Sequence, residues 1–570
     1  MKRLRNFLKL PLRPRDRYAD IAPEDIFLDS SNLPKFDRNQ FEGRLEKPIS
    51  SSVPLYLGVF FLFVGLVFVF RLFSLQIVEG KTYAQKSENN RLRHTLIFSE
   101  RGVVYDRNKV ELAWNSIHPN NPDFSLREYT SLPGLSHLLG YLKYPSKDSD
   151  GFYYQETFDG REGVERAYDV LLGGANGLKI TETDALGAVQ SESVIEPPVR
   201  GRSLSLSVDS AIQSKLYEII RETAGNVGFR AGSGLIMDVQ TGEMLALASY
   251  PEYSSAVLTG GDSEQIRNYV NNPYTPFLNR AVAGLYTPGS IVKPFLALAA
   301  LNEQIISPEK QILSTGSISI PNPYAPGQSS VFKDWKAHGW VDMRHALAVS
   351  SDVYFYEIGG GFEDQQGLGI QRIDEYMKKF GFGEETGIDL PHEETGLIPT
   401  PQWKEETFNG EAWRVGDTYN TAIGQYSVQV TPIQIVRAIA AIANEGMLLR
   451  PKIVSEGKIE STSLNIPSEY FTIVKEGMRM AVTEGTAQGL SVPFVKVAAK
   501  TGTAELGVAK QYVNSWIVGF FPFDVPRYAF AVVMERGPVT NLIGGAYVMR
   551  QLLDWMNAHT PEYFEAKPAN

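Results

Sequence analysis

The segment that most restricts the fold of this 570-residue chain lies near its N-terminus. Residues Val53 to Phe70, V-P-L-Y-L-G-V-F-F-L-F-V-G-L-V-F-V-F, are uncharged, and after Arg71 the apolar run resumes as L-F-S-L-Q-I-V. At about 1.5 Å per residue, a helix here comes close to the roughly 30 Å hydrocarbon core of a bilayer. Because apolar residues cover every face of such a helix, a soluble core helix is disfavoured. We expect one transmembrane anchor over 53–76.

The flanking charges predict the orientation of this anchor. Basic residues dominate the first part of the chain, opposed there only by Asp16: Lys2, Arg3, Arg5, Lys9, Arg13, Arg15 and Arg17. Positive charge is retained in the cytoplasm, so residues 1–52 are predicted to be a cytoplasmic tail. The rest of the chain then lies outside the inner (cytoplasmic) membrane. A cleaved signal peptide is disfavoured because no small-x-small site follows the apolar run.

Composition excludes several classes of function. The 43% hydrophobic and 21% charged content is typical of folded protein, and the length predicts two or more domains. A net charge of -10 argues against a nucleic-acid binder, which needs a basic face. With no cysteine, disulfides, thiolate metal sites and cysteine nucleophiles are excluded. The histidines are scattered, which disfavours a Ser-His-Asp triad.

The patterning after the anchor predicts two modules. Residues 77–198 are polar and turn-rich with short strand-like runs, which favours an elongated, mainly-β pedestal. Beyond them, A-I-Q-S-K-L-Y-E-I-I is an amphipathic helix pattern, and two apolar runs flanking 240–242 predict a hairpin. S-W-I-V-G-F-F and Y-A-F-A-V-V-M-E predict a second hairpin, followed by a helix. We therefore expect an α+β domain over 199–560, with a central antiparallel sheet covered by helices, and a tail at 561–570.

A Ser-x-x-Lys pair in Y-T-P-G-S-I-V-K-P-F has a distinctive context. Thr-Pro-Gly cannot extend a helix backward, whereas I-V-K-P-F-L-A-L-A-A-L is apolar and helical, so Ser290 is predicted to start a helix. Side chains three apart share a helical face, so the Lys293 amine is expected to reach the Ser290 hydroxyl. Pro294 fits only near a first turn. Three other pairs lack such a helix: Ser307 with Lys310, Ser330 with Lys333 and Ser455 with Lys458.

For Ser290 and Lys293 to act as nucleophile and base, further side chains are needed nearby. A serine hydroxyl is a poor nucleophile until a base takes its proton, and lysine is a base only as the neutral amine, which burial and a nearby cation favour. V-A-A-K-T-G-T-A-E places Lys500 on a strand-like segment, with a hydroxyl at Thr501 and, at Gly502, room for a substrate backbone. This suits a ligand that ends in a carboxylate. A third element, A-V-S-S-D-V-Y-F-Y, carries Ser350 and Asp352.

These elements resemble the Ser-x-x-Lys, Ser-x-Asn and Lys-Thr-Gly motifs of the class B penicillin-binding proteins, which are membrane-anchored peptidoglycan D,D-transpeptidases. Further stretches are similar to that family and occur in order after the anchor: R-G-V-V-Y-D-R, R-E-G-V-E-R-A-Y, R-A-V-A-G-L-Y-T-P-G-S-I-V-K-P-F, G-D-T-Y-N-T-A-I-G-Q, V-T-P-I-Q and K-T-G-T-A-E. The resemblance covers nearly the whole chain from the anchor onward. It implies a serine-type D-Ala-D-Ala transpeptidase without a cofactor.

Carried over by residue, the resemblance implies that Ser290 is the acylated nucleophile, that Lys293 is its base and that Ser350 relays protons. The donor is then a D-Ala-D-Ala stem peptide whose last residue Ser290 displaces. An amine from a second stem peptide resolves the acyl-enzyme into a crosslink. β-Lactams are the implied inhibitors.

The resemblance also implies how the substrate is held. Lys500 and the hydroxyls of Thr501 and Thr503 bind the terminal carboxylate. The backbone N–H groups of Ser290 and Thr503 form the oxyanion hole, and such donors typically lower the barrier by about 3 kcal/mol each.

One departure from the family pattern is the motif Ser350-Ser351-Asp352, which usually ends in asparagine. An ionised aspartate accepts hydrogen bonds but donates none, so we expect Asp352 to pair with Lys293 or Lys500. Ser-x-Asp resembles the elongation-type members, which are similar to penicillin-binding protein 2 and act with a polytopic glycan polymerase of the rod system. The stretch D-W-K-A-H-G, residues 334 to 339, points the same way.

Some elongation-type relatives bind zinc near this stretch through aspartate, histidine and cysteine. Asp334 and His338 match two such ligands, but Ser351 stands where the cysteine would be. We therefore predict no metal and a structural role for His338. Trp516 is close to Lys500 in sequence, and we favour a core position for it over a place in the binding groove.

Other functions remain as alternatives. A β-lactamase would lack the anchor and the pedestal, and a penicillin-sensing receptor would need a signalling half. A scaffold that only binds the polymerase would be expected to lose one of the three motifs. About 120 residues between anchor and catalytic domain are too few for a second, glycosyltransferase enzyme. A division-type transpeptidase of the same family stays open.

Overall fold

The computed structural model describes residues 52–83, 92–119, 121–149, 153–183, 189–322, 327–507, 510–541 and 543–565. Its contacts divide the chain into two units, Met1–Asn90 and Arg91–Asn570. The predicted cytoplasmic tail, up to residue 51, lies outside the described residues, as do positions 566–570 of the C-terminal tail.

The described part of the first unit is dominated by one apolar helix. α1 (Ser52–Phe73) continues into the π-helical segment η4 (Ser74–Val78), and none of its side chains is buried. These 27 residues span about 40 Å, which is long enough to cross a membrane. Among the described residues it is the one helix with that length and composition. It coincides with the anchor expected over 53–76.

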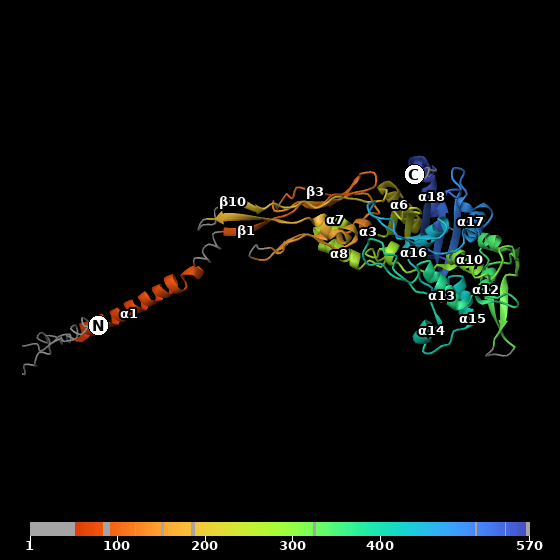
Figure 1. Cartoon of the computed structure of the whole chain (residues 1–570), viewed down its shortest axis with the longest axis horizontal. Helices are drawn as coiled ribbons and strands as arrows, with labels where there is room; N and C mark the ends of the chain where they lie inside the picture. Colours follow the sequence, from red (N-terminus) through yellow and green to blue (C-terminus); the bar gives the residue numbers. More distant parts are fainter. Residues whose placement is uncertain are drawn as a thin grey trace, which may run out of the picture. The chain divides into compact units, whose positions relative to one another are not determined.

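The second unit begins with two small sheets, whose strands lie in the predicted pedestal except for β11, which lies just beyond residue 198 (Figure 1). The first has the order β1-β9-β10 and consists of β1 (Leu92–Ile97), β9 (Gly177–Thr183) and β10 (Val189–Glu196). The second has the order β11-β2-β3-β4 and consists of β2 (Val104–Tyr105), β3 (Glu111–Ser116), β4 (Leu126–Tyr129) and β11 (Leu204–Ser205). This part of the chain also contains two two-stranded pairs and three short helices. The pairs are β5 (Leu142–Lys143) with β8 (Asp159–Gly160) and β6 (Ser146–Lys147) with β7 (Tyr153–Gln155), and the helices are α3 (Ser136–Leu139), α4 (Gly163–Ala167) and α5 (Asp169–Gly173). The pedestal is thus mainly β, as expected.

A buried ion cluster explains two of the sequence stretches quoted above. Glu165 is held between Arg101 at 2.5 Å and Arg127 at 2.7 Å, and all three side chains are almost fully buried. Burial alone would raise the pKa of Glu165, but the two arginine charges outweigh it and hold that pKa below its ordinary value. Arg101 starts R-G-V-V-Y-D-R and Glu165 is the second acid of R-E-G-V-E-R-A-Y, so both stretches serve the pedestal's structure.

The sheet of the domain expected over 199–560 has five antiparallel strands in the order β13-β12-β22-β21-β20. They are β12 (Ala231–Asp238), β13 (Met244–Tyr250), β20 (Ala498–Leu506), β21 (Tyr512–Phe521) and β22 (Tyr528–Pro538). Both predicted hairpins are present, and β12 pairs with β22, so the two ends of the domain meet in one sheet. β20 lies at an edge of this sheet.

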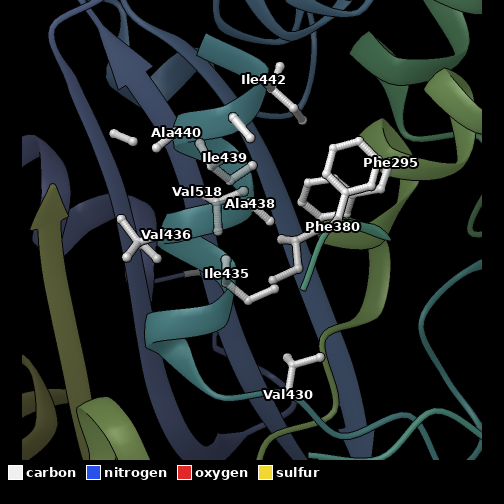
Figure 2. Close-up of a cluster of buried hydrophobic side chains, with 14 of the residues drawn as sticks. Phe295, Phe380, Val430, Ile435, Val436, Ala438, Ile439, Ala440, Ile442 and Val518 are labelled. Carbon is white, nitrogen blue, oxygen red and sulfur yellow. The ribbon is translucent and has the colours of Figure 1, made fainter. Parts of the chain in front are cut away.

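Helices cover both faces of this sheet. α6 (Ser210–Val227), which is N-capped by Asp209, and α18 (Gly545–His559) lie on one face. α16 (Pro432–Ala443) lies on the other, and its side chains pack against Val518 of β21 (Figure 2). Phe295 of α10 (Lys293–Asn302) and Phe380 have ring centroids 5.0 Å apart at the outer side of this cluster. α16 is almost entirely buried, and its side chains are apolar except for Gln434 and the partly exposed Arg437.

The domain also contains shorter helices and three short strand pairs. The helices are α7 (Ser255–Gly260), α8 (Ser263–Val270), α9 (Arg280–Ala283), α11 (Met343–Val349), α12 (Asp352–Gly360), α13 (Gly369–Lys379), α14 (Pro401–Thr407), α15 (Val415–Ala422), α17 (Ser468–Thr483), η6 (Gln488–Leu490) and η7 (Pro561–Tyr563). The short strand pairs are β14 (Ile312–Ser314) with β17 (Gly339–Val341), β15 (Ser317–Pro321) with β16 (Ser329–Lys333), and β18 (Met447–Leu449) with β19 (Ser461–Ser463).

Candidate active site

Ser290 lies on a short 3-10 helix, η5 (Gly289–Val292), which runs directly into α10. It therefore starts the helix, as predicted, although its first turn is tighter than an α-helical one. Its side chain is half-buried, and Ser290 Oγ has no hydrogen-bond partner among the described residues. In this conformation its hydroxyl makes no hydrogen bond to Lys293, which differs from the expectation.

The serine turn is packed closely against the edge strand β20. Gly289 has φ +59, and a Cβ built on it would lie 2.9 Å from the Thr503 carbonyl oxygen. A Cβ at Gly502 would lie 2.8 Å from both the Pro288 oxygen and a methyl carbon of Ile291. Two glycines thus let the turn and the strand approach each other. The space at Gly502 is filled by the protein's own serine turn, which differs from the expectation that it admits a substrate backbone.

Lys293 is fully buried, and its amine is bonded to the turn between α11 and α12. Nζ lies 2.8 Å from the carbonyl oxygen of Ser350, 3.3 Å from Ser350 Oγ and 2.6 Å from Asp352 Oδ1. The structure thus brings the Ser-x-x-Lys and Ser-x-Asp elements together. Asp352 pairs with Lys293, which is one of the two partners expected for it.

Lys500 reaches the same turn from β20. Its amine donates to Ser350 Oγ at 2.7 Å and to the Thr501 carbonyl oxygen at 2.9 Å, and its side chain is fully buried. Burial, together with the neighbouring charge of Lys293, holds the pKa of Lys500 well below its ordinary value, against a smaller opposing effect of Asp352. Ser350 Oγ therefore bridges the two lysines.

The backbone at Ser350 is in the left-handed region, with φ +60. This residue ends α11, and Ser351 then caps α12 by accepting a hydrogen bond from the Tyr354 N–H at 3.3 Å. A left-handed conformation costs a non-glycine residue roughly 1–2 kcal/mol. The sharp turn aims both the Ser350 hydroxyl and its carbonyl oxygen at Lys293.

Asp334 supports this turn from behind through hydrogen bonds to its carboxylate. Its Oδ2 accepts from Ser314 Oγ at 3.2 Å, Ser351 Oγ at 2.9 Å and the Val353 N–H at 3.0 Å. His338 Nε2 is 3.4 Å from Oδ1, and Ser351 offers a hydroxyl that is already a donor. Within the described ranges, no group of three or more histidine, aspartate or glutamate side chains has the arrangement of a metal site. The Asp334 carboxylate is thus occupied by three donors, whereas His338 Nε2 is buried without a hydrogen-bond partner in the part of the chain that the structure describes.

The two threonines of β20 have different surroundings. Thr501 Oγ1 is 2.7 Å from Thr486 Oγ1, whereas Thr503 is exposed and its carbonyl oxygen accepts from Gln425 Nε2 at 3.3 Å. Thr486 and Gln425 were not singled out from the sequence. Gln425 ends the stretch G-D-T-Y-N-T-A-I-G-Q, which could have signalled it. Thr486 lies in a turn after α17 and carried no signal.

Trp516 of β21 is buried, with 1% of its surface exposed, which agrees with the preferred core interpretation. Its indole N–H donates to the Thr287 carbonyl oxygen at 3.1 Å, three residues before Ser290. The tryptophan therefore fixes the segment that leads into the serine turn.

A comparison with protein families identifies the fold that carries this site. Residues 232–553 match the penicillin-binding protein transpeptidase domain, which is more than half of the chain. The chain belongs to the penicillin-binding protein transpeptidase family. Residues 123–206 of this penicillin-binding protein match the penicillin-binding protein dimerisation domain.

Curated relatives extend the match along most of the chain. The peptidoglycan D,D-transpeptidase MrdA of Acinetobacter baumannii is 29% identical over 600 residues, covering 86% of this chain and 86% of the relative. MrdA of Escherichia coli K12 is 29% identical over 616 residues, covering 89% and 94%. The expected relationship to the elongation-type penicillin-binding proteins is confirmed.

Solved structures agree with the fold. Penicillin-binding protein 2 of Helicobacter pylori, in a complex with MreC, has a TM-score of 0.69 at 26% identity and covers 82% of this chain and 100% of its own. A chain from a peptidoglycan synthase complex that coordinates polymerization and crosslinking has a TM-score of 0.66 at 25% identity, covering 91% and 100%. The expected α+β architecture, with one apolar helix, a pedestal and a transpeptidase domain, is confirmed.

Proposed function

We propose that this peptidoglycan D,D-transpeptidase of cell-wall elongation forms its crosslinks through an acyl-enzyme on Ser290. The convergence of Lys293, Ser350 and Lys500 beside the serine turn carries this proposal. Three distant stretches of the chain meet there, and two buried amines share one hydroxyl. Such an arrangement stores and moves protons next to a nucleophile.

The first step is binding of the donor stem peptide. The terminal carboxylate of D-Ala-D-Ala is held by Lys500 with the hydroxyls of Thr501 and Thr503. The position of Thr503 on the edge strand β20, with its side chain exposed, supports this. The arriving carboxylate favours a charged Lys500, and the proton passes to it from Lys293 through Ser350 Oγ. The lowered pKa of Lys500 supports a starting state in which this amine can accept that proton.

The second step is acylation. Lys293, now neutral, takes the proton from Ser290 Oγ while the oxygen attacks the carbonyl carbon of the penultimate D-Ala. The N–H groups of Ser290 and Thr503 stabilise the oxyanion, and each such donor is worth about 3 kcal/mol. The C–N bond to the last D-Ala breaks, and that residue leaves as an amine that receives the proton.

The third step is transfer to the acceptor. An amine of a second stem peptide attacks the ester at Ser290, a new C–N bond forms and Ser290 Oγ leaves with a proton. Asp352 is assigned to hold Lys293 in place through its ion pair of 2.6 Å. β-Lactams inhibit by entering the first two steps and leaving a stable ester.

The domains follow the same proposal: a cytoplasmic tail at 1–52, an anchor at 53–76, a pedestal at 77–198, the transpeptidase domain at 199–560 and a C-terminal tail at 561–570. The chain is placed in the inner membrane with its N-terminus in the cytoplasm and its catalytic domain in the periplasm. The basic residues before α1 support this orientation.

The proposed partner is a polytopic glycan polymerase of the rod-elongation system. Supporting this, the structural relative from a peptidoglycan synthase complex is described as coordinating polymerization and crosslinking. Stem peptides are the substrates, and no nucleic acid and no metal or other cofactor take part.

A fluorescent penicillin tests the function. The purified chain is expected to be labelled covalently, and Ser290→Ala is expected to abolish the label. Ser307→Ala is the matched control, since Ser307 heads another Ser-x-x-Lys pair, and its labelling should equal that of the wild type. Persistent labelling of Ser290→Ala would reject the nucleophile.

A further inference from the structure

An ion pair outside the three motifs touches the segment that carries the nucleophile. Arg280 of α9 and Glu535 of β22 lie 2.8 Å apart, Nε to Oε2, with no part of the arginine side chain and 18% of the glutamate side chain exposed. Tyr286 donates its hydroxyl to the same Oε2 at 3.1 Å. Tyr286 is four residues before Ser290, so one carboxylate oxygen holds both ends of the sequence that leads into the serine turn.

The guanidinium is fixed on its other side as well. Arg280 Nη2 donates to the Tyr274 carbonyl oxygen at 2.9 Å and to Thr275 Oγ1 at 3.0 Å, and Nη1 donates to the Thr275 carbonyl oxygen at 3.2 Å. The planar Arg280 guanidinium is bonded through Nε on one side and through Nη1 and Nη2 on the other, so it has one orientation and also fixes the carboxylate of Glu535. The pair is therefore a rigid support and not a mobile surface contact.

The strand is irregular where it presents this glutamate. The pairing of β21 with β22 shifts between Val513 and Ser515, which marks a β-bulge opposite residues 535–536. Arg536 has φ +53, and its N–H is bonded to Asn514 Oδ1 at 2.9 Å. A left-handed non-glycine residue costs about 1–3 kcal/mol, and bulges re-aim side chains near active sites. The bulge interrupts the regular pairing at Glu535 and Arg536, and pairing resumes at Gly537.

Tyr286 in turn is linked to the rest of the serine segment. Its ring packs edge-on against Trp516 at 5.9 Å, and Trp516 bonds to the Thr287 carbonyl oxygen. The Tyr286 backbone also exchanges two hydrogen bonds of 3.0 Å with Val430. A shift of Glu535 would thus move residues 286–287 and, through them, the Ser290 hydroxyl.

We propose that Arg280 and Glu535 are positioning residues, which hold Tyr286 and so set Ser290 for attack. Neither touches the substrate, and the chemistry remains with Ser290 and Lys293. This proposal rests on the acyl-enzyme function above. It gives a reason for an arginine ten positions before the nucleophile, at the start of the stretch R-A-V-A-G-L-Y-T-P-G-S.

Stopped-flow acylation of the full chain in detergent micelles by a fluorescent penicillin tests it, because the concentration dependence separates the dissociation constant of the first complex from the acylation rate constant. Glu535→Gln is expected to lower the acylation rate constant roughly 100-fold, the effect of a misplaced reactant. Tyr286→Phe, which removes one hydroxyl, should lower it about fivefold. The dissociation constant should change less than about twofold in both, because Lys500 and β20 are untouched.

The matched control is Glu243→Gln. Glu243 is 20% exposed and pairs with Lys452 at 3.5 Å, at the turn between β12 and β13, so its burial and charge resemble those of Glu535. Its acylation kinetics should equal those of the wild type. If Glu535→Gln does not fold, Tyr286→Phe decides alone.

Unchanged rate constants in both variants, or a lower amplitude of labelling with an unchanged rate constant, would overturn the positioning role. Failure of the wild type itself to be acylated would instead reject the proposed function, so the two failures are distinguishable.

Discussion

Lys293 Nζ and Asp352 Oδ1 lie 2.6 Å apart in an ion pair in which the lysine is fully buried. The same amine is bonded to the carbonyl oxygen of Ser350, whereas Ser290 Oγ has no partner among the residues that the structure describes. The amine of Lys293, the proposed base, is thus held by Asp352 and Ser350 in the absence of substrate. For Lys293 to act as a base, its amine must first lose a proton to a neighbouring group.

Lys293→Met should leave the first complex with penicillin intact but lower the acylation rate constant by roughly 10²–10⁴-fold, the usual contribution of a positioned base. Stopped-flow kinetics measure both quantities. Lys310→Met is the control: Lys310 belongs to another Ser-x-x-Lys pair, and its amine bonds only Gln365 at 2.8 Å. A Lys293→Met variant that acylates at the wild-type rate would show that another group is the base.

Two variants of Ser350 separate its backbone role from its hydroxyl role. Both Ser350→Ala and Ser350→Gly remove the bridge between the two lysines, so both should acylate at least about 100-fold more slowly. Since φ is +60 here, the glycine variant should have a free energy of unfolding about 1 kcal/mol higher than the alanine variant. Acylation is followed with penicillin and stability by urea unfolding. Normal acylation by the alanine variant would exclude the relay.

Lys500→Met should abolish acylation and stabilise the fold at neutral pH. Burial lowers the pKa of Lys500, so between that pKa and about 10.5 the unfolded chain binds more protons than the folded one. The penalty is complete below the folded pKa and disappears as pH rises towards 10.5. The variant's melting temperature should therefore exceed that of the wild type at neutral pH, and the difference should shrink at higher pH. A gap that widens with pH would contradict the lowered pKa.

Asp334→Ala should destabilise the fold by about 2–4 kcal/mol, because three donors, including Ser351 Oγ and the Val353 N–H, lose their acceptor. Addition of a chelator to the wild type should leave its melting temperature unchanged within error. Both are measured by thermal unfolding, with elemental analysis for zinc. Stoichiometric zinc in the purified chain, lost with Asp334, would show that a metal and not hydrogen bonding holds this turn.

The sequence predicted the elements of the fold well where periodicity and turn residues agree. The hairpins of β12 with β13 and β21 with β22 follow from apolar runs on either side of a turn, and α1 follows from length and composition. Residues 203–209, S-L-S-L-S-V-D, alternate with the period of a strand, but within this run only β11 (Leu204–Ser205) is a strand, and it is parallel to β2. Its pairing depends on a strand a hundred residues earlier, which no local pattern reveals.

The residues of the site could be predicted from the sequence, but the hydrogen bonds between them could not. Ser-x-x-Lys spacing placed Ser290 and Lys293 on one turn, but it could not show that the Lys293 amine bonds Ser350 and Asp352 instead. Burial and a neighbouring cation lower the pKa of Lys500, because its side chain is fully buried with the charge of Lys293 beside it. Glu535 was missed because it lies at a bulge within β22, which no sequence pattern announced, and its partner Arg280 is distant in sequence.

Mass spectrometry after exposure to a β-lactam tests the central claim most directly. The intact chain should gain the mass of one whole β-lactam, and proteolysis should place that mass on the peptide that contains Ser290. No adduct should form on Ser290→Ala. An adduct on a different residue, or a wild-type chain that stays unmodified under conditions in which it is folded, would contradict the account.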